Sequence, residues 1–336
     1  MDGKPAEKPT TQSPSDSPSH RRHSNLLSTI LQPILHELDV IERLLRSNAG
    51  GSCFVFLGGL LARFLRAPPP SLADAVEATL HTLAVGFMCS YVFDICNQAT
   101  SPEEDVLNKP YRPIPAGLIT VDQAKARWFL SWTLGPLATH YFYGPWAAVH
   151  LLEFEAVIAF CYVWPRWFSW FNRNLFVFLL YTIQDRILNQ ALLEAADVPG
   201  WDLGVLIDLA VSAWFMGTVH VQEFHDLEGD RKSDRKTLPM LLSPRGLRRL
   251  RAGTAVYIVA FGSALAFFGY QKITMGQEGD SPVLITLLSA LQLISSVALA
   301  YRIWASTSAE MDKATFYNLY YVPVFMILLS LPLVTT

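Results

Sequence analysis

Long apolar runs constrain the fold of this chain more than any other feature of its sequence. Of its 336 residues, 51% are hydrophobic and only 16% are charged. Since a helix needs about 20 mainly apolar residues to cross the hydrocarbon core of a bilayer, the runs predict an all-α integral membrane protein with about nine transmembrane helices. The predicted spans fall near residues 51–66, 76–97, 128–144, 146–164, 174–193, 203–224, 252–271, 282–303 and 315–334.

The amino-terminal part of the chain differs from these runs. Residues 1–26 are rich in Ser, Pro and charged residues, and we expect a disordered polar tail because such a segment buries too little apolar surface to fold. Residues 27–48 mix leucine and isoleucine with charges, which predicts an amphipathic helix along the membrane interface. Residues 49–336 form the predicted transmembrane domain.

The distribution of basic residues predicts the topology. Lysines and arginines gather in alternate loops, above all between Arg231 and Arg251, whereas the loop around Asp197 and Asp202 on the other side is acidic. Cytoplasmic loops of membrane proteins are enriched in Lys and Arg. We therefore expect a multi-pass protein, in the endoplasmic reticulum membrane, whose basic loops face the cytosol.

Two loops on the predicted cytosolic side combine carboxylates with cations. Motif 1 covers residues 94–117 and follows the second predicted span; motif 2 covers residues 222–239 and follows the sixth. The candidate metal ligands of motif 1 are Asn97, Glu104 and Asp105, and its candidate diphosphate-binding cations are Lys109 and Arg112. Mg²⁺ prefers oxygen ligands, and charged donors bind phosphate oxygens. Motif 1 alone is equally compatible with an ordinary loop that ends a helix.

Motif 2 has the more regular spacing. Asp226, Asp230 and Asp234 are four residues apart, which keeps their side chains on one face of a helix. The basic side chains that alternate with them include Arg231, Arg235 and Lys236. This pattern predicts a site for Mg²⁺ and a diphosphate, and the alternative interpretation is a solvated charged loop.

Together the two motifs resemble those of the UbiA superfamily of intramembrane prenyltransferases. That superfamily carries N-D-x-x-D-x-x-x-D followed by R-P-x-P-x-G, and D-x-x-x-D-x-x-x-D in its second motif. Motif 2 keeps the second pattern, and R-P-I-P-A-G lies in motif 1. Motif 1 departs from the pattern: when Asp105 is its last acidic position, the other aspartates of the family fall on Gln98 and Ser101. This variant, with NKPYRPIPAG after it, is similar to the membrane-bound UbiA-type terpene cyclases.

The resemblance implies helices around a central cavity and assigns roles to the motif residues. The residues with an implied catalytic role are Asn97, Asp105, Asp226 and Asp230. The implied Mg²⁺ ligands are Asn97, Glu104, Asp105, Asp226, Asp230 and Asp234, and the implied diphosphate-binding residues are Lys109, Arg112, Arg231, Arg235 and Lys236.

The resemblance leaves three hypotheses open for the function. The first is Mg²⁺-dependent ionisation of a prenyl diphosphate, expected to be farnesyl diphosphate, followed by intramolecular cyclisation. The second is a prenyltransferase that passes the prenyl group to an aromatic or other acceptor. The third is a membrane protein with an acidic ion-binding site and no catalysis. The expected partners are the substrate and the lipid bilayer; no feature indicates nucleic-acid binding, and the sequence identifies no protein partner.

Other polar and aromatic residues of the predicted spans are candidates for the site or its support. A basic residue between the fourth and fifth spans, either Arg166 or Arg173, is implied by the resemblance. We expect Gln184 to line the cavity, and we interpret Asp185 beside Arg186 as a structural pair, because ionisable groups in a bilayer need partners. Aromatic faces that could stabilise an allylic cation belong to Tyr91, Phe93, Tyr162, Trp164, Tyr181, Trp214, Phe215 and Phe224.

Overall fold

Helices are the regular elements of this protein throughout the part of the chain that the computed structural model describes, which comprises residues 18–163, 169–195, 198, 200–232, 236–275 and 281–334. The α-helices are α1 (Pro18–Leu45), α2 (Ala49–Arg66), α3 (Leu72–Thr100), α4 (Pro102–Asn108), α5 (Val121–Ile158), α6 (Ser169–Ala195), α7 (Val205–Thr218), α8 (Leu227–Lys232), α9 (Pro244–Thr274), α10 (Pro282–Ala305), α11 (Ala309–Thr315) and α12 (Tyr321–Val334). The shorter turns are η1 (Ala159–Val163) and η4 (Phe316–Tyr320), which are π-helical, and η2 (Val219–Glu223) and η3 (Leu238–Leu241), which are 3₁₀-helical.

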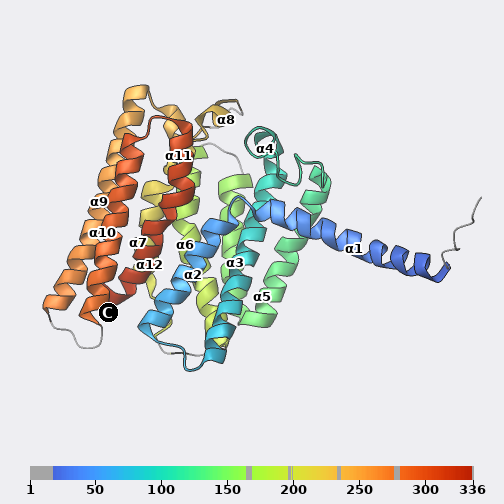
Figure 1. Cartoon of the computed structure of the whole chain (residues 1–336), viewed down its shortest axis with the longest axis horizontal. Coiled ribbons are helices and arrows are strands. Elements are labelled where there is room, and N and C mark those ends of the chain that lie inside the picture. Colours follow the sequence, from blue (N-terminus) through green and yellow to red (C-terminus); the bar gives the residue numbers. More distant parts are fainter. Residues whose placement is uncertain are drawn as a thin grey trace, which may run out of the picture. The chain divides into compact units, whose positions relative to one another are not determined.

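Residues 43–336 form one compact unit in which neighbouring helices pack as a bundle (Figure 1). α2 packs on α3, α3 on α5 and α6, α6 on α7, and α9 on α10. α12 packs against both α10 and α2, so the last helix of the chain closes the bundle onto the first helix of the unit. The short helices α4, α8 and α11 lie together at one end, and this end carries both motifs (Figure 1).

Seven helical segments among the described residues are long and apolar enough to cross a membrane. They are Ala49–Arg66, Leu72–Thr100, Val121–Val163, Val205–Glu223, Pro244–Thr274, Pro282–Ala305 and Ala309–Val334. The segment Val121–Val163 corresponds to two predicted spans, and the predicted span 174–193 lies in α6, which is outside these seven. The predicted all-α membrane architecture is confirmed, and the number nine stays a prediction.

A glycine divides the long helix α5. Gly144 has φ of 79° and ψ of 175°, which glycine adopts without the steric penalty of a Cβ, and Pro145 follows it. A Cβ at Gly135 would lie 3.5 Å from Leu151 Cδ2. In a straight helix these residues would be about 24 Å apart. The two halves of α5 therefore fold back on each other as a helical hairpin.

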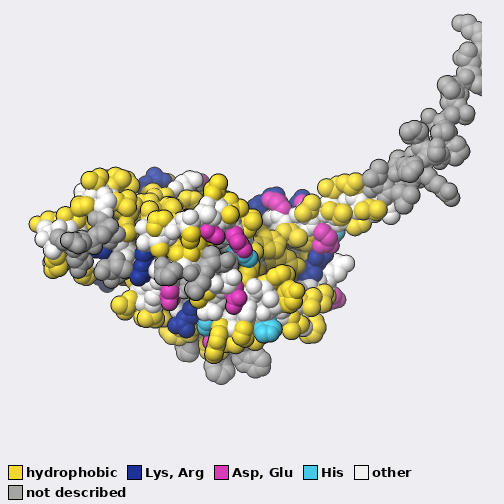
Figure 2. Space-filling model, turned by 90° about the horizontal axis from the view of Figure 1, so that it is seen from below, with side chains coloured by type: hydrophobic (Ala, Val, Ile, Leu, Met, Phe, Trp, Pro, Cys, Tyr) yellow, Lys and Arg dark blue, Asp and Glu magenta, His cyan; other side chains and the backbone are white. Residues whose placement is uncertain are grey.

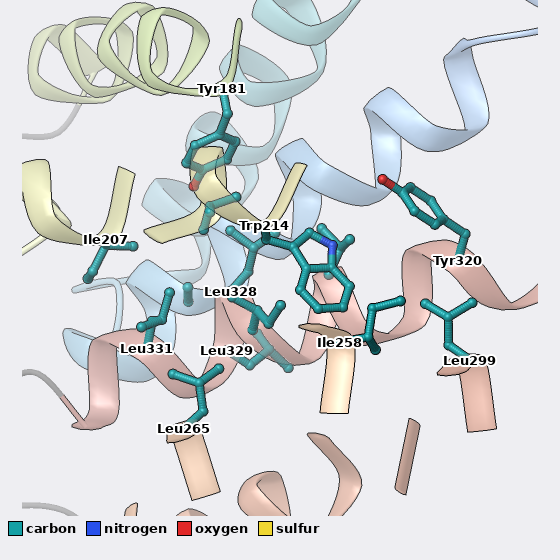
Figure 3. Close-up of a cluster of buried hydrophobic side chains, with 14 of the residues drawn as sticks. Tyr181, Ile207, Trp214, Ile258, Leu265, Leu299, Tyr320, Leu328, Leu329 and Leu331 are labelled. Atoms are coloured by element: carbon teal, nitrogen blue, oxygen red, sulfur yellow. The ribbon is translucent and has the colours of Figure 1, made fainter. Parts of the chain in front are cut away.

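Two apolar clusters hold the bundle together. One joins α7, α9, α10 and α12 around the fully buried Trp214, with Ile258 and Leu328 among its neighbours (Figure 3). The other joins α2, α3, α5 and α6 and includes Phe154 and Leu188. Close packing of these side chains, and not their removal from water, holds the helices together in a bilayer, because lipid tails are as apolar as the core. The cavity described below lies where residues of both halves meet.

The outer surface of the bundle is also apolar. Large hydrophobic side chains are exposed on most of its helices, such as Leu80 on α3, Phe129 on α5 and Ile294 on α10. Seen from the end opposite α4 and α8, apolar side chains make up much of the coloured surface (Figure 2). A surface with this much exposed hydrophobic area is stable against lipid rather than water.

Residues 1–42 form a separate unit, and the described part of it is helix α1. The apolar side chains Ile30, Ile34 and Leu38 recur at a helical spacing of four and are exposed. This pattern is the one expected of an interfacial helix, and the predicted domain boundaries at residues 26 and 48 stay predictions. Most of the predicted polar tail lies outside the described residues.

A buried ion pair lies inside the bundle near the carboxyl end of α2. Arg63 Nη2 donates to both carboxylate oxygens of Asp185, at 2.8 and 2.9 Å, and also to Asn189. Arg63 is completely buried. The expectation that Asp185 pairs with Arg186 is therefore wrong: adjacent residues of a helix point about 100° apart, and Asp185 faces α2 instead.

This pair makes a testable prediction about stability. Arg63→Ala should lower the free energy of unfolding by about 3–5 kcal/mol, because it leaves the Asp185 carboxylate buried without its cation. Thermal unfolding of the purified protein in detergent measures the effect, with the exposed Arg248→Ala as the control. The double variant Arg63→Met, Asp185→Leu should recover much of the loss; equal melting of Arg63→Ala and the unaltered protein would contradict this role.

Candidate active site

Both motifs line one cavity of about 290 Å³ at the end of the bundle that carries α4 and α8. Motif 1 contributes Asn97, Glu104 and Lys109 to its wall, and motif 2 contributes Asp226. Gln184 lines it as well, as predicted. Residues separated by more than a hundred positions in the sequence thus converge on one chamber.

Close packing of two short helices brings the motifs together. A side chain at Gly229 in α8 would overlap the Asn108 side chain at the end of α4. Asn108 also lines the cavity. Because Gly229 has no Cβ, the Asn108 side chain occupies the space that a side chain at this position would fill, and α8 lies close to the end of α4 here.

The carboxylates of the two motifs act on one another electrostatically. Burial raises the pKa of Asp230 to about 7; Arg173 opposes this, and the carboxylates of Asp226, Glu104 and Glu223 add to the rise. Asp230 is 1% exposed. Carboxylates gathered in this way favour a cation among them, because each lowers the cost of bringing in positive charge. Their oxygens form the kind of donor set that Mg²⁺ prefers.

Within motif 1, Asp105 and Arg112 hold each other. Arg112 Nη1 donates to both carboxylate oxygens of Asp105, at 2.7 and 2.9 Å, and its Nη2 donates to Ser47 Oγ at 2.8 Å. Both charged side chains are buried. Burial raises the pKa of Asp105 against the opposing effect of Arg112. Burial and the charge of Arg112 lower the pKa of the neighbouring Lys109.

The end of α1 and the turn that follows it, residues 44–48, fasten motif 1 at two further points. Gln98 Nε2 donates to the Leu44 carbonyl oxygen at 3.0 Å, and Asn48 Nδ2 donates to Asp94 Oδ1. Gln98 is buried and is not among the residues that line the cavity. This hydrogen bond explains structurally why glutamine stands at this position of motif 1, because an aspartate could accept but not donate it. The sequence offers no signal for these contacts.

Arg173 is the described basic residue between the two middle spans. It lines the cavity, and its Nε lies 3.4 Å from Glu223 Oε1. Its alternative, Arg166, lies outside the described residues. Arg173 supplies positive charge next to Asp230, since it lowers the pKa of that carboxyl.

The other predicted cations of motif 2 are placed differently. Arg231 and Lys236 are exposed and do not line the cavity. Asp234 and Arg235 lie outside the described residues. Within the described part of the chain, no three His, Cys, Asp or Glu side chains are close enough to hold a metal ion by themselves. The roles predicted for these residues stay predictions.

Aromatic rings make up much of the apolar wall. Phe93, Tyr162 and Phe176 form a compact group with ring centroids 4.9–5.1 Å apart. Near the carboxyl end of the chain, η4 and the start of α12 contribute four further rings to the cavity wall, which are Phe316, Tyr317, Tyr320 and Tyr321. Tyr162 belongs to η1, so both π-helical turns aim aromatic side chains at the cavity, and such turns are frequent at functional sites.

The sequence identified part of this aromatic wall. Phe93, Tyr162 and Phe215 line the cavity, whereas Tyr181 and Trp214 belong to the buried core. Phe224 and Tyr91 do not line the cavity, and Trp164 lies outside the described residues. The rings of η4 were missed because a π-helical turn changes which side of a helix a residue faces, and apolar periodicity assumes a regular helix.

Comparison with known proteins places the chain. A sequence profile described as the UbiA prenyltransferase family matches residues 52–326. The chain belongs to this family. It is a multi-pass membrane protein, as the membrane-length helices also indicate.

Two related protein sequences and one solved structure agree with this assignment. The diterpene cyclase eriG of Hericium erinaceus is 28% identical over 308 residues, which cover 90% of this chain and 90% of that protein. The polyprenyl transferase eriF of the same organism is 26% identical over 248 residues, covering 71% of this chain and 76% of that protein. A UbiA homolog from Archaeoglobus fulgidus, solved bound to DMAPP and Mg²⁺, has a TM-score of 0.53 and 17% identity, covering 88% of this chain and 97% of that chain.

The contact of Gln98 makes a prediction that separates a structural role from a metal-binding one. Gln98→Glu keeps the length of the side chain but removes its N–H donor, so two acceptors would face each other in a buried place. We expect a loss of about 1–3 kcal/mol in the free energy of unfolding, measured by thermal unfolding in detergent.

Gln123→Glu is the matched control for this variant. Gln123 uses its Oε1 to accept from the Thr120 backbone N–H in a helix cap, and a carboxylate can do the same. Unchanged stability of Gln98→Glu, with or without Mg²⁺, would show that the hydrogen bond to Leu44 does not matter.

Proposed function

We propose that this protein binds a prenyl diphosphate with Mg²⁺, ionises it and cyclises the resulting cation inside the bundle. The observation that carries the proposal is the convergence of motif 1 and motif 2 at the polar end of an aromatic-lined cavity. The similarity to a protein named as a diterpene cyclase, along nearly the whole chain, supports it.

The acidic side chains fit Mg²⁺ by their chemistry. Asn97, Glu104 and Asp226 offer oxygen donors on the cavity wall, whereas Asp230 is buried and is not among the lining residues. Mg²⁺ is commonly held by one or two carboxylates together with the phosphates of a substrate. These residues would hold the metal, with Asp234 as a further ligand predicted from the sequence. When bound, Mg²⁺ would neutralise charge on the leaving diphosphate. A UbiA homolog solved with DMAPP and Mg²⁺ is a precedent for this pairing.

Cationic side chains of the cavity would bind the diphosphate. Lys109 and Arg173 line the wall beside the carboxylates, and among the described residues neither is held in a bidentate ion pair. Asp105 fixes the position of the Arg112 guanidinium, so this positive group would contribute without a rearrangement of its side chain. Charges that are already in place stabilise a developing anion without reorganisation.

The aromatic wall would receive the hydrocarbon chain and the cation. The group of Phe93, Tyr162 and Phe176 lies on the same cavity as Asn97 and Lys109, which places π faces next to the ionising end. A desolvated cation gains about 2 kcal/mol from an aromatic face. The apolar surroundings would also keep water away from the cation.

Transfer of the prenyl group to an acceptor is the second candidate function. The observation that favours it is the similarity to a protein named as a polyprenyl transferase. Both functions share the ionisation step and differ only in whether a second molecule captures the cation. We place the protein in the endoplasmic reticulum membrane with both motifs facing the cytosol, where prenyl diphosphates would enter.

Incubation with substrate separates the candidates. Microsomes that contain the protein are supplied with Mg²⁺ and either farnesyl or geranylgeranyl diphosphate, and released diphosphate and organic products are measured. We expect diphosphate release and a cyclic hydrocarbon or alcohol without an acceptor. Product formation only when an aromatic acceptor is added would favour transfer. If the protein releases diphosphate from neither farnesyl nor geranylgeranyl diphosphate, both candidates are overturned.

Variants of motif 2 test the metal-binding residues. Asp226→Asn and Asp230→Asn should each lower diphosphate release at least about 100-fold, because developing charge on the leaving group loses its stabilisation. Glu228→Gln is the control: the Glu228 side chain lies in α8 with Asp230, is 82% exposed, and pairs with the Lys232 side chain at 2.8 Å. Activity within about twofold of the unaltered protein in either aspartate variant would contradict the assignment.

A further inference from the structure

Asp94 is a buried carboxylate on the cavity wall that the proposed ionisation does not use. It lies on α3 inside the membrane-length segment Leu72–Thr100, and it lines the cavity. Its side chain has no exposed surface. A carboxylate within a membrane span is costly, and such residues usually face an interior cavity and have a function.

Its two oxygens are in different situations. Oδ1 accepts a hydrogen bond from Asn48 Nδ2, which fixes the orientation of the carboxylate. Oδ2 is buried and has no hydrogen-bond partner among the described residues. A buried carboxylate oxygen without a donor costs roughly 1–3 kcal/mol, so its retention needs a reason. An oxygen held ready to accept a proton from a bound molecule is such a reason.

Asp94 is also deeper than the carboxylates proposed to hold Mg²⁺. It precedes Asn97 by three residues, or about 4.5 Å along the helix axis. Glu104 and Asp226 lie beyond the ends of their membrane-length segments, whereas Cys89, Ser90 and Phe93 line the wall beside Asp94. The carboxylate is therefore between the polar end of the cavity and its apolar interior.

We propose that Asp94 is the catalytic base that ends the reaction. This inference rests on the proposed function and applies to both of its candidates whenever the cation ends as a hydrocarbon or as a prenylated aromatic ring, since each of these neutral products forms by loss of a proton from carbon. A C–H bond next to the cationic centre breaks, its electron pair forms a C=C bond (or restores the aromatic ring), and the proton passes to Asp94 Oδ2. The proton leaves to solvent when the product departs.

Asp94→Asn tests this step separately from ionisation. The amide keeps the size of the side chain but cannot take the proton. We expect formation of the deprotonated hydrocarbon or prenylated product to fall by about 100-fold, the usual contribution of a positioned base, while diphosphate release stays within about threefold. The cation should then be captured by water, so prenyl alcohols should replace the normal product in extracts analysed by gas chromatography and mass spectrometry.

Two further variants keep the test decisive. Asp94→Glu retains a carboxylate and moves it by one methylene, so it should shift the position of the new double bond in the product. This variant tests the proposal even if Asp94→Asn does not fold. Glu155→Gln is the matched control, because Glu155 is a buried carboxylate in α5 that does not line the cavity, and we expect an unchanged product profile.

The possible failures are distinguishable. Normal products at the normal rate from both Asp94 variants would overturn the role of the base. Loss of diphosphate release in folded Asp94→Asn would also overturn it, because Asp94 would then act in ionisation. If the unaltered protein itself releases no diphosphate, the proposed function fails, and the inference fails with it.

Discussion

Burial of acidic side chains beside a cavity that both motifs line is the constraint on which this site depends. Burial is the largest cause of the raised pKa of Asp230, and the carboxylates of Asp226 and Glu104 add to it because charges are poorly screened in such a place. The two motifs lie close together where α8 approaches the end of α4 at Gly229. The fold thus maintains an arrangement that binding of Mg²⁺ and a diphosphate would stabilise.

Most of the supporting contacts are made by residues outside the acidic pattern. The turn at residues 44–48 bonds to Gln98, Asp94 and Arg112, so the entry to α2 fixes the end of α3 and the loop after α4. At the far half of the bundle, Arg63 fixes α2 to α6 through Asp185. A helix with two such anchors has little freedom to shift, and preorganised groups are what stabilisation of developing charge requires.

The sequence predicted the membrane fold, because apolar run length is a local property, and the resemblance of the two motifs to those of the family implied that they share one site. The sequence could not predict partners across the bundle. Asp185 pairs with Arg63 instead of its neighbour, and Asp105 pairs with Arg112, which sequence reasoning assigned separately to metal and diphosphate. The aromatic side chains of η4 could not be predicted either, since Tyr317 lines the cavity from a π-helical turn, where the periodicity of a regular helix does not apply.

Cross-linking of the two motifs tests the central claim, that they meet over one cavity, most directly. In a chain whose own cysteines are replaced by alanine, Asn108→Cys and Gly229→Cys are combined and oxidised in native membranes. We predict rapid disulfide formation, seen as a mobility shift that reductant reverses, and none for Asn108→Cys with Asp202→Cys, which lies beside the start of α7. A chain that folds normally but forms no cross-link between positions 108 and 229 would contradict the account.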